Sequence, residues 1–195
     1  GITLLLIPLD TPGISVRPLL DMGGSHSFNE IFFDNVRVPK SCLIGEKNGG
    51  ISLIITELDI ERASGAGADT AGRSQRFLEK LTAYAKDIGY RGVSLSKDAV
   101  IRQALVEREV EIEVTRLLAY RVVWMLTKGI VAQYEASVSK VYGNEMQIRL
   151  ARTGLDLLGM YGTLQDDPRR SRLAKEAWDM CLFAFSWLFA GGTNE

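Results

Sequence analysis

The first 45 residues carry apolar and polar positions in the order that is typical of β-strands. Ile2–Leu9 is a nearly continuous apolar run, and the turn-forming sequence Asp10-Thr11-Pro12-Gly13 follows it. Residues 14–18 then alternate between apolar and polar, and a less regular run spans Phe28–Val38. These patterns predict three or four short strands. Because so few strands cannot form a whole sandwich, we expect this segment to be the last part of a larger β domain.

Beyond this segment the apolar positions repeat every three or four residues, as in amphipathic helices. The clearest repeat lies within Asp98–Lys128, and its apolar members are Val106, Val110, Val114, Leu117, Leu118, Val122 and Met125. The same period predicts helices over Gly50–Ile88, Val131–Leu158 and Leu173–Phe189. Four helices joined by short connections imply an antiparallel bundle. The predicted fold class is therefore mostly α: an up-down four-helix bundle preceded by a few strands of an incomplete β domain.

The change of period divides the chain into two predicted domains, residues 1–47 and 48–195. The 195 residues are 46% hydrophobic and 24% charged with a formal net charge of −1, which excludes a disordered chain and a coiled-coil rod. Acids and bases are interleaved, so no basic surface for nucleic acid is predicted, and the apolar run Met180–Ala190 is far shorter than the ~20 residues of a membrane span. Cys42 and Cys181 form no CxxC motif, which indicates a cytoplasmic protein without structural zinc.

Few residues are candidates for catalysis. The single histidine, His26, has no clustered metal ligands beside it in the sequence and no GxSxG motif accompanies it, so we predict neither a metal site nor serine–histidine chemistry. Glu61 is the most interesting carboxylate, because it lies one helical turn before a row of small residues, Ser64, Ala68 and Ala71, where a flat ligand or another backbone could approach. A carboxylate in an apolar cleft is a good proton acceptor near neutral pH. The alternative is a surface or arginine-paired carboxylate.

The order of short motifs along the whole chain resembles the acyl-CoA dehydrogenases, flavoenzymes that oxidise the Cα–Cβ bond of acyl-CoA thioesters. In chain order the motifs are Pro8-Leu9-Asp10-Thr11-Pro12-Gly13-Ile14, Phe28-Asn29-Glu30-Ile31-Phe32-Phe33-Asp34-Asn35-Val36-Arg37-Val38-Pro39, Leu43-Ile44-Gly45-Glu46, Asn48-Gly49-Gly50, Glu61-Arg62-Ala63, Tyr84-Ala85 and Gly191-Gly192-Thr193-Asn194-Glu195. The family has an N-terminal helical domain, a middle β domain and a C-terminal four-helix domain. The resemblance implies that this chain carries the end of the second and nearly all of the third, so we expect a fragment that by itself binds no FAD and has no activity.

The resemblance also assigns roles to individual residues. In this family a glutamate removes the α-proton of an acyl-CoA thioester while the β-hydride passes to the flavin of FAD. Many members carry this glutamate near the C-terminus, at the position matched here by Gly191. Others, such as the isovaleryl and long-chain branches, carry it in an Asp-x-Glu-Arg motif that matches Glu61. The resemblance therefore implies Glu61 as the catalytic base, Asp59 and Arg62 on the CoA-binding side, and Thr193 in contact with the flavin.

Five positions depart from the family's pattern, and members of the family use them to bind the FAD of a neighbouring subunit. The arginine and phenylalanine of a Tyr-Ala-x-x-Arg-x-x-Phe-Gly pattern are replaced by Ile88 and Arg91, a glutamine is replaced near Ala99, and a glycine-rich motif contains Asp156 and Met160. An aspartate repels a diphosphate, and a methionine side chain blocks close approach to the backbone. We therefore expect a hetero-oligomer in which this chain supplies the base and a paralogous subunit supplies these FAD contacts, as in steroid-type dehydrogenases.

Several alternatives are left open at this stage. The chain could form a homo-oligomer such as a tetramer, act as a non-catalytic partner subunit in which Glu61 is only structural, or be a helical scaffold without cofactor. The retained Gly-Thr-Asn-Glu end argues against the scaffold. Oxidases share the fold, so a dehydrogenase that passes electrons to an electron-transfer flavoprotein in lipid β-oxidation is implied by the resemblance alone. The sequence does not identify the acyl group.

Overall fold

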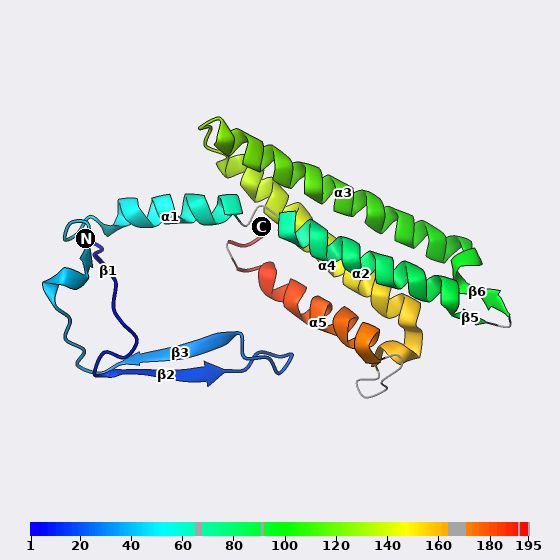
Figure 1. Ribbon diagram of the computed structural model, residues 1–195, viewed down its shortest axis with the longest axis horizontal. Helices are drawn as coiled ribbons and strands as arrows, with labels where there is room; N and C mark the ends of the chain where they lie inside the picture. The colour runs from blue at the N-terminus through cyan, green and yellow to red at the C-terminus, as the bar shows by residue number, and fades with distance from the viewer. Residues whose placement is uncertain (65–67, 91, 164–170, 191, 195) are drawn as a thin grey trace. The chain divides into compact units, whose positions relative to one another are not determined.

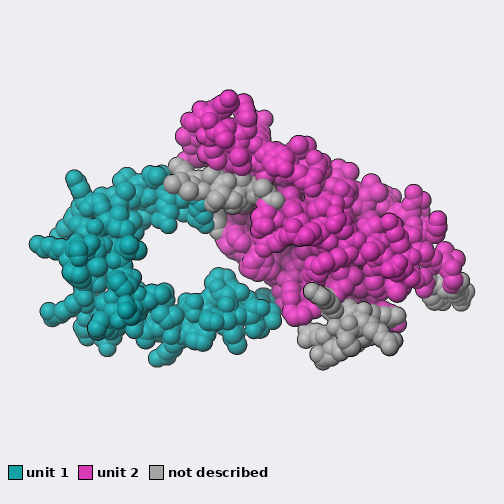
Figure 2. Space-filling model, in the orientation of Figure 1, with its two compact units in different colours: residues 1–61 teal, residues 62–195 magenta. Residues whose placement is uncertain are grey.

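The computed structural model divides into two compact units, Gly1–Glu61 and Arg62–Glu195 (Figure 2). The described residues are 1–64, 68–90, 92–163, 171–190 and 192–194. The predicted domain boundary between residues 47 and 48 stays a prediction.

The first unit contains four short strands in two antiparallel pairs (Figure 1). β1 (Leu4–Leu5) pairs with β4 (Leu43–Ile44), and β2 (Ile14–Leu19) pairs with β3 (Phe28–Phe33) as a hairpin. Nearly all side chains of this hairpin are exposed, on both of its faces. Its apolar side chains therefore do not pack into a core formed by the described residues. The predicted number of strands is confirmed.

Two of the predicted strands are shorter than expected. Of the apolar run Ile2–Leu9 only Leu4–Leu5 forms a strand, because the partner strand β4 offers only two residues to pair with. The strand predicted over Phe28–Val38 ends at Phe33, since the chain turns at Asn35, whose φ of 48° lies in the left-handed region. The apolar runs in this segment are therefore longer than the paired strands that they contain.

The single helix predicted over Gly50–Ile88 is wrong, because the structure has α1 (Gly50–Ser64) and α2 (Ala68–Asp87) in its place. Residues 65–67 lie outside the described residues, and their sequence contains two glycines, each of which costs a helix interior about 1 kcal/mol relative to alanine. Of the predicted row of small residues, Ala71 is fully buried, and the side chains of the other two lie outside the described part.

Four helices of the second unit form the predicted antiparallel bundle: α2, α3 (Ala99–Thr127), α4 (Gln133–Leu158) and α5 (Ser171–Trp187) (Figure 1). The Asp98 carboxylate accepts hydrogen bonds from the first backbone amides of α3, which caps that helix. Between α2 and α3 lie the two-residue strands β5 (Gly89–Tyr90) and β6 (Val93–Ser94). The predicted fold class is confirmed, with α2 rather than α1 as its first helix.

The core of the bundle draws buried side chains from all four helices. Its members are Ala71, Phe77, Leu78, Leu81, Ile112, Met146, Leu150, Leu158, Ala174 and Ala177. Burying a large aliphatic or aromatic side chain contributes about 1.5–3 kcal/mol. This core holds the four helices together, and the packed helices in turn position the polar side chains near both ends of the bundle.

The antiparallel order gives the bundle two distinct ends. At one end α2 and α4 finish and α3 begins, and at the other end α3 and α5 finish and α4 begins (Figure 1). Ion pairs follow this order, since Glu111 in the middle of α3 pairs with Arg149 of α4, and Arg121 near the end of α3 pairs with Glu135 near the start of α4.

Candidate functional site

The predicted base, Glu61, lies in the last turn of α1 and is the final residue of the first unit. Its side chain is exposed, so the described residues do not enclose it in the apolar cleft that the sequence suggested. Asp59 and Arg62 share the helix with it, and their side chains lie outside the described part of the chain. Their roles, like that of Glu61, stay predictions.

Thr193, the predicted flavin contact, lies in the segment that follows α5 at the end of the second unit. Its side chain is exposed, while neighbouring Asn194 is half-buried. The Asn194 backbone amide donates to the Leu188 carbonyl oxygen over 3.2 Å, which folds the segment back toward the end of α5. Gly191, where many family members have their glutamate, lies outside the described residues.

Two polar side chains of α4 hold this segment, and the sequence did not reveal them. Lys140 Nζ donates to the Gly192 carbonyl oxygen over 2.5 Å and to Asn194 Oδ1 over 2.8 Å. One helical turn further, Asn144 Nδ2 donates to the Trp187 carbonyl oxygen over 2.7 Å. The sequence carried one signal for these two contacts: a lysine and an asparagine four residues apart on a helix face that is otherwise buried. Their partners lie more than 40 residues away and cannot be identified from such a spacing.

The positions that depart from the family's pattern lie at the opposite end of the bundle. Ile88 follows the last residue of α2, Ala99 begins α3, Asp156 is in the last turn of α4, and Met160 follows α4. Asp156 is exposed, and 89% of Met160 is exposed. Arg91 lies outside the described residues. The topology thus brings four of these five positions to one end.

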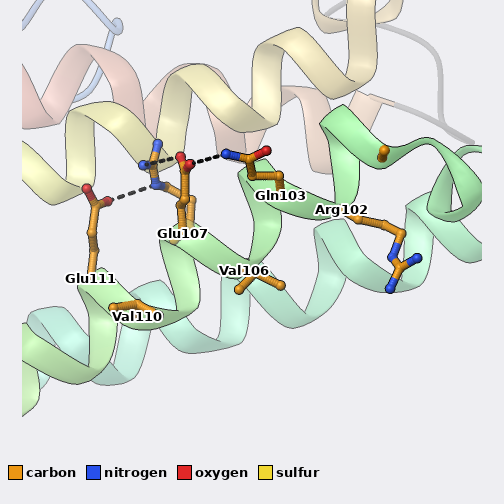
Figure 3. A pocket seen from close by; sticks show the side chains of 8 residues that line it. Arg102, Gln103, Val106, Glu107, Val110 and Glu111 are labelled. Atoms are coloured by element: carbon orange, nitrogen blue, oxygen red, sulfur yellow. Dashed lines mark hydrogen bonds and ion pairs between the residues drawn. The ribbon is translucent and has the colours of Figure 1, made fainter.

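A groove of about 650 Å³ runs along α3 from Ala99 to Glu111 (Figure 3). Gln103 Nε2 donates to Glu107 Oε1 over 3.0 Å, and Arg108 lies between Glu107 and Glu111, with its Nε 2.8 Å from Glu111 Oε2. Figure 3 shows Gln103 and Glu107 directed toward one another along the helix. The groove therefore combines two arginines and two glutamates with apolar side chains, and its charges balance.

The two ends of the bundle differ in how well they suit a bound FAD. At the end that contains Thr193, a hydroxyl side chain is exposed, and the polar amide of Asn194 lies beside it. At the other end, Asp156 offers negative charge and Met160 a bulky apolar side chain. The residues described at the Met160 end therefore do not suit the diphosphate of FAD, and the uncharged polar residues of the Thr193 end suit it better.

The described residues offer neither a metal site nor a membrane-spanning helix. No group of three or more His, Cys, Asp or Glu side chains in the described part of the chain could hold a metal ion. Among the same residues no helix is long and apolar enough to cross a membrane.

Comparison with known proteins gives consistent results. The family model described as "Acyl-CoA dehydrogenase, C-terminal domain" matches residues 48–180. The chain is 28% identical over 195 residues to "Acyl-CoA dehydrogenase FadE29" of Mycobacterium tuberculosis, and the match covers 100% of this chain and 49% of that relative. The chain thus spans about half the length of the curated relatives it matches.

Solved structures give the same result at the level of the backbone. The structure titled "Tcur3481-Tcur3483 steroid ACAD" aligns with a TM-score of 0.87 and 30% sequence identity, covering 100% of this chain and 48% of that one. A glutaryl-coenzyme A dehydrogenase in complex with glutaryl-CoA aligns with a TM-score of 0.84 and 25% identity, again over 100% of this chain and 48% of the other.

Proposed function

The chain belongs to the acyl-CoA dehydrogenase family, and from this premise we propose that it supplies the catalytic base of an FAD-dependent acyl-CoA dehydrogenase. The observation that carries the proposal is the presence of Glu61 on α1, within the matched residues 48–180, together with Gly191 at the other position where the family keeps its glutamate. Glycine has no side chain that could accept a proton, so Glu61 is the remaining carboxylate.

Glu61 acts as a general base in this proposal. Its carboxylate takes the proton from the carbon next to the thioester carbonyl, and the carbonyl lowers the cost of the negative charge left behind. FAD, when bound, accepts the hydride from the β-carbon. Because a base must reach its proton at hydrogen-bond distance in a dry site, the exposed Glu61 side chain has to be covered by the acyl-CoA thioester before it works. Asp59 and Arg62 are proposed to line the CoA side of that site.

Thr193 is the residue proposed to hold FAD from this chain. Its support is the exposed side chain on a segment that hydrogen bonds fasten to α4 and α5. The match to the family's flavin-binding threonine is the other support.

The assembly proposed is a hetero-oligomer, such as a tetramer, with a paralogous subunit. Lys140 and Asp156 are sixteen residues apart on α4, which at 1.5 Å per residue is about 24 Å. The Thr193 end and the Met160 end of the bundle therefore serve different FAD molecules. Only the first end suits FAD, so half of the FAD sites of the assembly are proposed to be lost. Exposed apolar side chains on α3, such as Leu117, Tyr120 and Trp124, support burial against another subunit.

The finer assignments extend the same proposal. A bulky acyl-CoA, such as a steroid side-chain thioester, is the proposed substrate, because a structure 30% identical to this chain is titled a steroid ACAD. An electron-transfer flavoprotein is the proposed acceptor, and the reaction is proposed to be a step of lipid β-oxidation. Both cysteines are free thiols, which supports a cytoplasmic location.

The test of the base is Glu61→Gln, made in the complete reading frame that contains this chain. Turnover of acyl-CoA is expected to fall by about 10²–10⁴-fold, the usual contribution of a general base, while the FAD content stays unchanged. Glu57→Gln is the matched control, because Glu57 is an exposed glutamate one turn earlier on α1. Equal turnover of the two variants would reject Glu61 as the base.

The assembly is tested by the ratio of FAD to protein chains. A complex purified with its paralogue is expected to contain half as many FAD molecules as chains. One FAD for every chain in an oligomer of this chain alone would contradict the hetero-oligomer.

A second candidate function is a partner subunit without a catalytic role. The observations that favour it are the exposed Glu61 and the unsuitable Asp156 and Met160. In that case Glu61→Gln leaves the turnover of the purified complex unchanged, whereas the corresponding glutamate of the paralogue is essential.

A further inference from the structure

The segment Gly192–Asn194 is fastened to the first half of α4 by one lysine. Lys140 Nζ reaches a backbone carbonyl oxygen at 2.5 Å and the Asn194 side-chain oxygen at 2.8 Å, so it contacts the residue on each side of Thr193. These contacts join parts of the chain that are 52 and 54 residues apart in sequence. The position of Thr193 is therefore set from α4.

The partners of Lys140 differ from those of Lys80 and Lys175, two other lysines of the bundle. Lys80 pairs with Glu176 and Lys175 pairs with Asp179, both carboxylates, whereas the recorded partners of Lys140 Nζ are a carbonyl and an amide oxygen. Lys140 is half-buried, and burial lowers its pKa below the ordinary value. A desolvated ammonium group without a recorded carboxylate holds its neutral acceptors by charge-assisted hydrogen bonds, which are among the stronger ones in proteins.

The contact also fixes the orientation of the Asn194 amide. A lysine can only donate, so it must face Oδ1, and Nδ2 is then turned to the other side. Nδ2 is buried there without a recorded partner. Asn144 completes the arrangement, because it holds the Trp187 carbonyl oxygen at the end of α5, where the segment starts.

We infer that Lys140 is a positioning residue that orients Thr193 and Asn194 toward the flavin cofactor. This inference rests on the proposed function, since it takes Thr193 as the cofactor contact. Lys140 itself acts only through the segment that it holds. Its removal should therefore loosen the segment and weaken cofactor binding together, without disturbing the rest of the bundle.

The test compares Lys140→Met with the control Lys175→Met in the complete protein that contains this chain. Methionine keeps an unbranched apolar side chain, shorter than lysine by one atom, and removes the donors. Hydrogen exchange measured by mass spectrometry is expected to become at least about tenfold faster in the peptide that contains Gly192–Asn194, and unchanged in peptides of α2 and α3. The dissociation constant for FAD is expected to rise by about tenfold in Lys140→Met and to stay unchanged in the control.

A double-mutant cycle with Thr193→Val separates positioning from general stabilisation. If Lys140 acts through Thr193, its replacement should have little further effect on FAD binding once the Thr193 hydroxyl is gone. Additive effects of the two substitutions on FAD binding would overturn the inference, and so would unchanged exchange in Lys140→Met. Faster exchange with unchanged FAD binding overturns it as well.

Failure of the proposed function gives a different result. In that case the unmodified protein binds no FAD, with or without its paralogue, and this result overturns the role of Lys140 toward the cofactor. The hydrogen-exchange measurement still reports whether Lys140 fastens the segment Gly192–Asn194.

Discussion

Replacing Glu111 by glutamine removes the negative charge that joins α3 to α4. Its two carboxylate oxygens lie 2.8 Å from Arg108 Nε and 2.7 Å from Arg149 Nε, and only 17% of its side chain is exposed. Removing one member of a buried ion pair costs about 3–5 kcal/mol, whereas an exposed pair is worth about 0–1 kcal/mol. Arg108 is 13% exposed and Arg149 34%, so we expect a loss of about 2–3 kcal/mol in the free energy of unfolding.

The assay is urea unfolding of the purified protein followed by far-ultraviolet circular dichroism. Glu113→Gln provides the matched control, because Glu113 lies two residues away on α3, is 50% exposed and pairs only locally with Arg116. Its expected loss is about 0.2–0.5 kcal/mol. Equal losses in the two variants would refute the reasoning, because burial of the pair would then have no energetic consequence.

The same substitution has a spectroscopic consequence at Tyr142. Burial raises the pKa of Tyr142 above its ordinary value, the charge of Glu111 raises it further, and Arg149 and Arg108 oppose the rise. Glu111→Gln should therefore lower the pKa of Tyr142, so that its tyrosinate forms at lower pH than in the unmodified protein. Ultraviolet absorbance titration measures this, and an unchanged titration curve would mean that Glu111 does not act on this phenol.

Three further outcomes follow from packing and exposure. Gly154→Ala places a Cβ 2.9 Å from Phe77 Cζ, and this overpacking should cost about 1–3 kcal/mol in the free energy of unfolding. The higher helix propensity of alanine offsets about 1 kcal/mol of that cost, so we expect a net destabilisation. Gly143→Ala meets its nearest atom at 3.4 Å and should be neutral or stabilising by up to about 1 kcal/mol; chemical denaturation of both variants checks the order. A thiol reagent should modify Cys181 at least about tenfold more slowly than Cys42, because Cys181 is 9% exposed and burial raises its pKa, and equal rates in the folded protein would contradict this.

The long helices could be predicted from the sequence because their apolar period persists over many turns. The helices expected over residues 98–128, 131–158 and 173–189 correspond to α3, α4 and α5 within about two residues. The division between α1 and α2 was missed, because the small residues around Gly65 and Gly67 continued the helical pattern. Glycine lowers helix stability locally, but it does not break the period of the apolar positions.

The candidate site was less accessible to sequence reasoning. Glu61 and Thr193 were predicted from motifs that lie within a few residues of each of them, and their roles stay predictions. Lys140 and Asn144 were not found, because their partners lie across the bundle and a contact of this kind depends on how the helices turn against one another. The buried cluster around Glu111 was missed for the same reason: a helix that carries charges on several faces does not indicate which of them its neighbour will cover.

Hydrogen exchange at the α-carbon of the substrate reports directly whether Glu61 removes the α-proton. In deuterated water, a base that removes the α-proton of an acyl-CoA thioester returns deuterium to that carbon, which mass spectrometry detects. Glu61→Gln should slow this exchange by at least about 100-fold, while Glu57→Gln exchanges at the rate of the unmodified protein. Exchange at an unchanged rate in Glu61→Gln would mean that another group removes the proton and that Glu61 is not the base.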